Sequence, residues 1–150
     1  MREVIEMAAE NVRQGRGGPF AALVVHDGRV VARGTNLVTS TNDPTAHAEM
    51  VAIRAACAAL ASFQLDGCDL YTSCEPCPMC MGAIYWARPA RVFYASTRDD
   101  AARAGFDDAF IYEELQRSPE ARRIPMDNLL RDEAARAFDV WTAYETRVRY

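Results

Sequence analysis

The sequence predicts a single α/β domain, and three observations support this prediction. Short β-rich runs alternate with segments of helical apolar spacing along the amino-terminal part of the chain. A strand, a helix and a second strand follow one another between Asp69 and Ala95, which is the pattern of a parallel βαβ unit. The 150 residues, half of them hydrophobic, can bury one core and leave little room for a second.

The first elements are a helix and a β-hairpin. Apolar residues recur at helical spacing over residues 2–14, and the glycine-rich run from Gly15 to Gly18 ends that helix. The β-rich runs 20–25 and 30–33 flank Asp27-Gly28, a dipeptide that accepts the positive φ angles of a tight turn. We therefore expect these two strands to be antiparallel.

The remaining elements follow from composition and from proline positions. A polar loop from Thr39 to Thr45 leads to an alanine-rich helix. After about Ser96 the pattern changes to a loop with Gly105, a short helix, breaks at two prolines and a final amphipathic helix. The predicted bounds are helix 46–60, strand 69–73, helix 77–87 ended by Pro89, strand 91–95, helix 110–115 and helix 127–144.

Two short motifs carry the chemistry. His47-Ala48-Glu49 is followed, 28 residues after the Glu, by Cys77 and Cys80 in a Pro-Cys-x-x-Cys motif. One imidazole and two thiolates are a natural ligand set for catalytic Zn²⁺, because three protein ligands leave the fourth tetrahedral position open for water. His-x-Glu with Pro-Cys-x-x-Cys is the pattern of zinc-dependent base deaminases.

The spacing of these residues requires helix starts. His47 and Glu49 would lie on nearly opposite sides of a mid-helix segment, so they must belong to a first turn. With Cys77 near the N-cap, Pro78 at the first helical position and Cys80 one turn along, both sulfurs face the same point beyond the helix end. The partial positive charge of that helix end favours the thiolate forms.

Other readings of these residues remain open. Cys74 offers a fourth ligand, which would close the coordination sphere as Cys₃His and make the protein a zinc-stabilised binding module. That reading gives Glu49 no role beyond a surface ion pair. Cys57 and Cys68 are most simply buried small hydrophobic residues, and His26 beside the hairpin turn is an ordinary surface or core histidine.

At these residues the sequence resembles the cytidine-deaminase superfamily and, within it, the guanine deaminase subfamily over almost the whole chain. Two segments, Ala83 to Pro89 and Ala104 to Asp108, distinguish it from the tRNA adenosine deaminases, which share the Pro-Thr-Ala-His-Ala-Glu motif. The segments that carry the resemblance are Gly18 to Phe20 with Asn36, Asn42 to Glu49, Thr72 to Cys80, Ala83 to Pro89, and Ala104 to Asp108.

The resemblance implies a three-layer α/β/α fold around a mixed five-stranded sheet. It also implies a single deaminase domain, 1–150, that forms a homodimer in which the segment from about 96 to 150 is exchanged between subunits. The substrate contacts that it implies are Asn36 as a hydrogen-bonding partner of the purine, Phe20 stacked on the ring, Ala48, and Asp108 with Tyr150 closing the pocket. Trp86 is a further candidate, but its place in a helix that covers the sheet makes packing in the core at least as consistent as a substrate contact.

The activity implied by the resemblance is hydrolysis of guanine to xanthine and ammonia. Zinc-bound hydroxide attacks C2, and Glu49 carries the proton from the nucleophile to the ring nitrogen and to the leaving amine. A deaminase of guanosine or of another amino-heterocycle remains an alternative, because the residues do not distinguish a free base from a nucleoside. A tRNA adenosine deaminase and a non-catalytic zinc module are further alternatives.

Charge and composition limit the partners. The net charge is −4 with a pI near 5.2, and the arginines are scattered instead of forming basic clusters, so we expect a small-molecule purine substrate and no nucleic acid. The longest apolar stretch, 50–61, contains Arg54 and is too short to span a bilayer. The acidic residues near Met1 suit neither a secretory nor a transit peptide, and we expect a cytoplasmic protein.

Overall fold

The computed structural model describes residues 1–106 and 108–150. Asp107, which belongs to the last of the segments that carry the family resemblance, lies outside the described residues. The chain divides into two compact units, Met1–Ala109 and Phe110–Tyr150. No helix in the part of the chain that the structure describes is long and apolar enough to cross a membrane.

The first unit is built on a mixed sheet with the strand order β2-β1-β3-β4. β1 is antiparallel to both β2 and β3, whereas β3 and β4 are parallel, which confirms the predicted hairpin and βαβ unit. The hairpin turn uses positive φ angles at Asp27 (48°) and Gly28 (73°), as its dipeptide predicts. The strands are β1 (Ala21–His26), β2 (Arg29–Thr35), β3 (Cys68–Cys74) and β4 (Arg91–Ser96).

The expectation of five strands is wrong for the described residues, which form a sheet of four. The fifth strand came from the family resemblance, because the sequence itself has four β-rich runs. After β4 the described residues form three α-helices and a 3₁₀ turn, with Pro119 and Pro125 between the last two helices.

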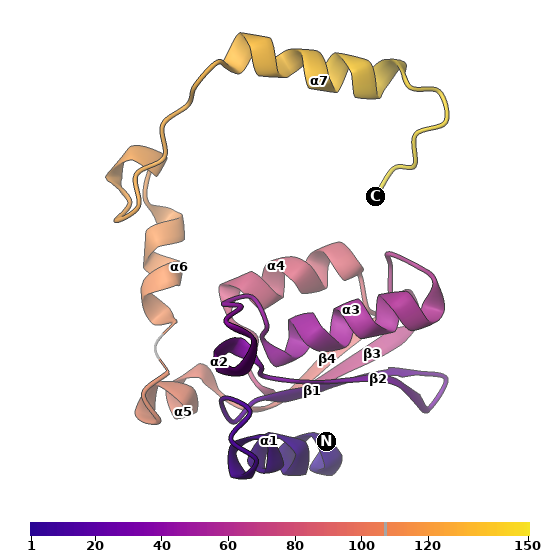
Figure 1. The fold of residues 1–150 in the computed structure, drawn as a ribbon, viewed down its shortest axis with the longest axis vertical. Coiled ribbons are helices and arrows are strands. Elements are labelled where there is room, and N and C mark those ends of the chain that lie inside the picture. Colours follow the sequence, from indigo (N-terminus) through magenta and orange to yellow (C-terminus); the bar gives the residue numbers. More distant parts are fainter. Residues whose placement is uncertain (107) are drawn as a thin grey trace. The chain divides into compact units, whose positions relative to one another are not determined.

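The sheet is covered on both faces, which gives the expected three layers. In Figure 1, α1 (Arg2–Arg13) lies against one face, and α3 (Ala48–Leu60) and α4 (Pro78–Ala87) lie against the other. Successive residues of a strand point to opposite faces. In β1, therefore, Ala22 and Val24 join the core under α3 and α4, whereas Ala21 and Leu23 join the core under α1.

Two short helices lie where loops were expected. α2 (Val38–Thr41) occupies the start of the polar loop before α3, and α5 (Arg98–Arg103) follows β4. The start of α5 is fixed by a capping box in which Thr97 and Asp100 exchange side-chain and backbone hydrogen bonds. That signature is present in the sequence, and the loop prediction for this segment is wrong.

The second unit is helical. It contains α6 (Ala109–Gln116, whose first residue belongs to the first unit), the 3₁₀ turn η1 (Pro119–Ala121) and α7 (Arg131–Ala143). Both helices agree with the predicted segments to within a few residues. None of the residues in these three elements is buried.

α3 lies unusually close to β2 because Gly34 has no side chain. A Cβ atom added at Gly34 would lie 2.2 Å from the backbone oxygen of Ala48 and 2.5 Å from the backbone nitrogen of Ala52. These are backbone atoms of the first two turns of α3, so they cannot move aside without moving the helix. Gly34 therefore fixes how closely the start of α3 approaches the sheet.

We predict that Gly34→Ala shifts the start of α3 and lowers the free energy of unfolding by about 1–3 kcal/mol. Gly82→Ala is the matched control, because Gly82 lies in α4 and a Cβ there meets no atom within 4 Å. It should be neutral or stabilising by up to about 1 kcal/mol. Urea unfolding of both variants measures the difference, and equal stabilities would contradict the role given to Gly34.

Candidate metal and active site

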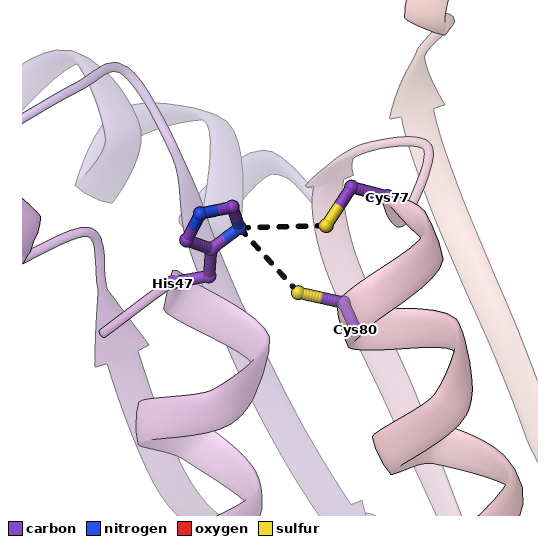
Figure 2. Close-up of side chains that lie close together, drawn as sticks. All are labelled: His47, Cys77 and Cys80. Atoms are coloured by element: carbon purple, nitrogen blue, oxygen red, sulfur yellow. Dashed lines mark hydrogen bonds between the residues drawn. The ribbon is translucent and has the colours of Figure 1, made fainter. Parts of the chain in front are cut away.

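The starts of α3 and α4 bring three candidate ligands together. His47 is the N-cap of α3 and Cys77 the N-cap of α4, with Cys80 in the first turn of α4. Figure 2 shows the imidazole on α3 facing the two sulfurs on α4, with Nδ1 of His47 3.5 Å from Sγ of Cys77 and 3.6 Å from Sγ of Cys80. The predicted helix starts are thus confirmed, including Pro78 at the first helical position.

This triangle fits a tetrahedral zinc ion. Zinc bonds of about 2.3 Å to sulfur and about 2.0 Å to nitrogen place the two ligand atoms about 3.5 Å apart. The two sulfur–nitrogen distances agree with that value, and all three ligand atoms lie within 4.8 Å of one another. Zn²⁺ is therefore the cofactor that this donor set suits, with one coordination position left for a non-protein ligand.

The charges of the cluster also favour a cation. Hydrogen bonds from Cys80 and then from His47 lower the pKa of the Cys77 thiol to about 4, although burial opposes this. The hydrogen bond between the two sulfurs raises the pKa of the Cys80 thiol, because Cys80 keeps the proton that it donates to Cys77; burial and then repulsion by the charges of Glu49 and Cys77 raise it further. A divalent cation removes that repulsion, so both sulfurs can bind as thiolates.

Glu49 lies beside the ligands and is not one of them. Its side chain is buried, with Oε1 accepting a hydrogen bond of 2.9 Å from Thr72 Oγ1 and Oε2 3.5 Å from Cys80 Sγ. Burial raises the pKa of this carboxyl group. A carboxyl group with a raised pKa next to a metal site is the arrangement expected of a proton shuttle.

Asn36 and Phe20 lie next to the start of α3. The backbone N–H of Asn36 donates to the Phe20 carbonyl (3.0 Å), and the following N–H, of Leu37, donates to the Ala46 carbonyl (2.9 Å). Asn36 Oδ1 accepts hydrogen bonds from the backbone N–H groups of Gly18 and Val38, each at 3.3 Å. Those two donors fix the orientation of the amide and leave its Nδ2 as the group that a ligand can accept from.

Asp108 and Ala48 also belong to the first unit; Asp108 places a charge near the ligands, whereas Ala48 is buried at the start of α3. The negative charge of Asp108 contributes to raising the pKa values of His47 and Cys74, so its carboxylate lies near the ligand cluster. Ala48 as a whole is fully buried. Its backbone N–H lies in the first turn of α3, where N–H groups have no acceptor within the helix.

Two aromatic residues differ from the other candidates. Tyr150 belongs to the second unit and its side chain is 70% exposed. Trp86 is 63% exposed on α4, so of the two alternatives left open for it, packing in the core is wrong for the single chain. α4 is apolar on most of its surface, and its sequence periodicity therefore does not show which face is covered.

Cys74 does not join the candidate ligands. It lies at the end of β3, is buried, and directs its Sγ to the backbone oxygen of Thr97 at 3.5 Å. The group of candidate ligands found among the described residues consists of His47, Cys77 and Cys80. Burial raises the pKa of the Cys74 thiol to about 11, which keeps it protonated. The closed Cys₃His site is therefore not formed.

Sequence reasoning missed Thr72 and Phe106. Thr72 is a polar residue at an inward-facing position of β3, between Leu70 and Cys74, and that interruption of an apolar face was the available signal. Phe106 contacts Phe20 edge to face, with ring centroids 4.8 Å apart. No local pattern indicates this second contact, because the two residues are far apart in the sequence.

The comparisons with known proteins agree with this site. Residues 1–96 match the family model described as the cytidine and deoxycytidylate deaminase zinc-binding region. The chain therefore belongs to the family of zinc-dependent cytidine and deoxycytidylate deaminases.

Within this family, the similarity to guanine deaminases extends over the whole chain. The chain is 52% identical to the guanine deaminase of Bacillus subtilis over 150 residues, covering 100% of this chain and 96% of that protein. The crystal structure of that enzyme matches with a TM-score of 0.97, covering 99% of this chain and 95% of the other. A solved guanine deaminase from Nitrosomonas europaea is 39% identical, with a TM-score of 0.67 over 71% of this chain and 62% of the other.

A tRNA-specific adenosine deaminase matches a smaller part of the chain. The enzyme from Agrobacterium fabrum is 50% identical over 78 residues, which is 52% of this chain and 51% of that protein. The shared part is thus half of each chain.

We predict that Cys74→Ser retains close to one zinc per chain, whereas Cys77→Ser loses most of it. Cys77 belongs to the ligand triangle and Cys74 contacts a backbone oxygen instead. Metal analysis of both purified variants by mass spectrometry measures the contents. Equal loss of zinc from the two variants would support the closed four-ligand site.

Proposed function

We propose that this protein hydrolyses guanine to xanthine and ammonia. The observation that carries the proposal is that its similarity to guanine deaminase covers the full chain, whereas the similarities to tRNA adenosine deaminases cover between 47% and 65% of it. In the reaction, water oxygen forms a bond to C2 of the purine and the bond from C2 to the amino nitrogen breaks. The acidic net charge and scattered arginines also favour a small substrate over a nucleic acid.

His47, Cys77 and Cys80 would hold the zinc ion, with Nδ1 as the histidine ligand atom. When bound, zinc lowers the pKa of a coordinated water to about 7 and so supplies the nucleophile at neutral pH. Glu49 accepts a proton from the attacking water and delivers protons to the ring nitrogen and to the departing amino group. Its raised pKa suits the first step, because a carboxylate that takes a proton from water must not be too weak a base, and the carboxylic acid that forms is still acidic enough to give the proton up again.

The base would be recognised by groups near the start of α3. Asn36 Nδ2 donates to a purine acceptor, the Ala48 N–H supplies a second donor, and Asp108 accepts from an N–H of the base. Phe20 supplies the aromatic surface for the ring, supported by the edge of Phe106. A base with a different donor and acceptor pattern would leave the buried amide of Asn36 unpaired and would bind poorly.

The second unit would complete the site of a partner subunit in an exchanged homodimer. Its large apolar side chains are exposed in the single chain, including Leu129 (80%), Phe138 (73%) and Val140 (71%). Side chains of this kind need a protein surface to cover them. Tyr150 lies at the end of this unit, and packing of the unit on a partner would bring Tyr150 over the pocket and exclude water.

We expect the zinc-loaded protein to release ammonia from guanine and much less from guanosine, adenine, cytosine or cytidine. If the protein turns over another compound faster than guanine, guanine is not its preferred substrate.

Glu49→Gln should keep its zinc but lower kcat by about 10²–10⁴-fold, because the amide cannot carry the proton. Ammonia release and metal content are measured on the same samples. If the Glu49→Gln variant keeps near-wild-type activity, the role of proton shuttle assigned to Glu49 is wrong.

We predict that deletion of residues 146–150 leaves a folded, zinc-loaded dimer that has lost most of its guanine deamination. The zinc ligands all precede residue 81, so the metal content should not change. Rates at low and at saturating guanine show whether substrate binding or turnover is affected, and sedimentation gives the oligomeric state. Full activity of the shortened protein would exclude the proposed closure by Tyr150.

A further inference from the structure

Thr72 places a hydroxyl group in an apolar layer of the first unit. It lies in β3 and is 1% exposed, on the same face of the strand as Leu70, which belongs to the core under α3 and α4. Burial of a hydroxyl group at such a position is unfavourable unless it is hydrogen-bonded. Its hydrogen-bond acceptor is Oε1 of Glu49, 2.9 Å away, on the start of α3.

The two oxygens of Glu49 have different surroundings. Oε1 accepts from Thr72, whereas Oε2 lies 3.5 Å from Cys80 Sγ and therefore faces the ligand triangle. In the metal-loaded protein Cys80 is a thiolate, which has no proton to donate. Among the described residues, Thr72 is then the remaining side chain that donates to this carboxylate.

We infer that Thr72 is a positioning residue that holds the Glu49 carboxylate with Oε2 toward the metal ligands. The inference rests on the proposed function. Thr72 keeps its own proton throughout, while Oε2 of Glu49 accepts the proton of the attacking water and gives it up again. Because the hydroxyl occupies Oε1, the side chain of Glu49 cannot rotate away from the ligands without losing a buried hydrogen bond.

The contact also explains why a Thr suits this position. The β-branched side chain restricts χ1, so the hydroxyl direction is fixed by the strand as well as by its acceptor. Displacement of a reacting group by about 1 Å lowers rates about 100-fold. A rigid donor on the sheet is thus an effective way to orient a flexible three-carbon side chain on a neighbouring helix.

The test is Thr72→Val, which keeps the shape of the side chain and removes the hydroxyl. We expect kcat for guanine to fall about 10–100-fold, with KM and zinc content close to wild type. Thr72→Ser restores the hydroxyl and should recover most of kcat. If the Thr72→Val variant does not fold, Thr72→Ala serves as a second variant that also lacks the hydroxyl group.

A matched control and a structural readout separate positioning from general damage. Ser73→Ala removes the neighbouring buried hydroxyl of β3, which accepts from the Ala21 N–H at 3.0 Å on the other face of the sheet. It should lower stability and leave kcat unchanged. A crystal structure of zinc-loaded Thr72→Val should show the Glu49 carboxylate turned away from Cys80.

The inference is overturned if Thr72→Val keeps wild-type kcat, if its Glu49 keeps the wild-type position, or if Thr72→Ser is as impaired as Thr72→Val. It is also overturned if the loss of activity follows loss of zinc. Failure of the proposed function gives a different result, because the wild type itself would then not deaminate guanine. If the wild type turns over another compound of the panel, the same variants are compared on that compound, and if it turns over none, both proposals fail.

Discussion

The meeting of two helix starts at one end of the strands, beside the ends of β2 and β3, is the constraint on which the rest of the structure depends. His47 and Cys77 are both N-caps, so the positive ends of α3 and α4 point toward the same three ligand atoms. The parallel βαβ unit brings α4 to this place, and the close approach of α3 to β2 at Gly34 brings the other helix. A change in either approach would move the three ligand atoms relative to one another.

The thiols and the carboxyl group at this place are difficult to ionise by themselves, but a bound cation and a hydrogen bond would stabilise their charged forms. Two adjacent thiols resist deprotonation of the second, and the buried carboxyl of Glu49 resists ionisation. A divalent cation stabilises the thiolates, and the Thr72 hydroxyl stabilises the carboxylate. The site therefore combines a ligand set that suits a metal ion with a buried carboxyl group that, under the proposed function, accepts and returns a proton.

The sequence was sufficient where local chemistry determines structure and insufficient where tertiary contacts do. The starts of α3 and α4 could be predicted, because the spacing of His47 from Glu49 and the Pro after Cys77 permit few other arrangements. The hydrogen bond from Thr72 to Glu49 joins residues 23 positions apart, and no periodicity of the sequence indicates that these two residues are partners. The number of strands was wrong because it was taken from the family and not from the four β-rich runs of the chain itself.

In the proposed dimer, the apolar side chains of the second unit would connect assembly to activity. A chain that leaves Phe138 and Leu129 exposed is driven to bury them, and the hydrophobic effect supplies that drive without regard to chemistry at the zinc site. If the unit packs on a partner subunit, as proposed, the same burial carries Tyr150 to the pocket. Closure of the pocket would then depend on dimerisation, and a substitution that weakens packing of α7 would lower activity without touching a ligand, a shuttle residue or the base.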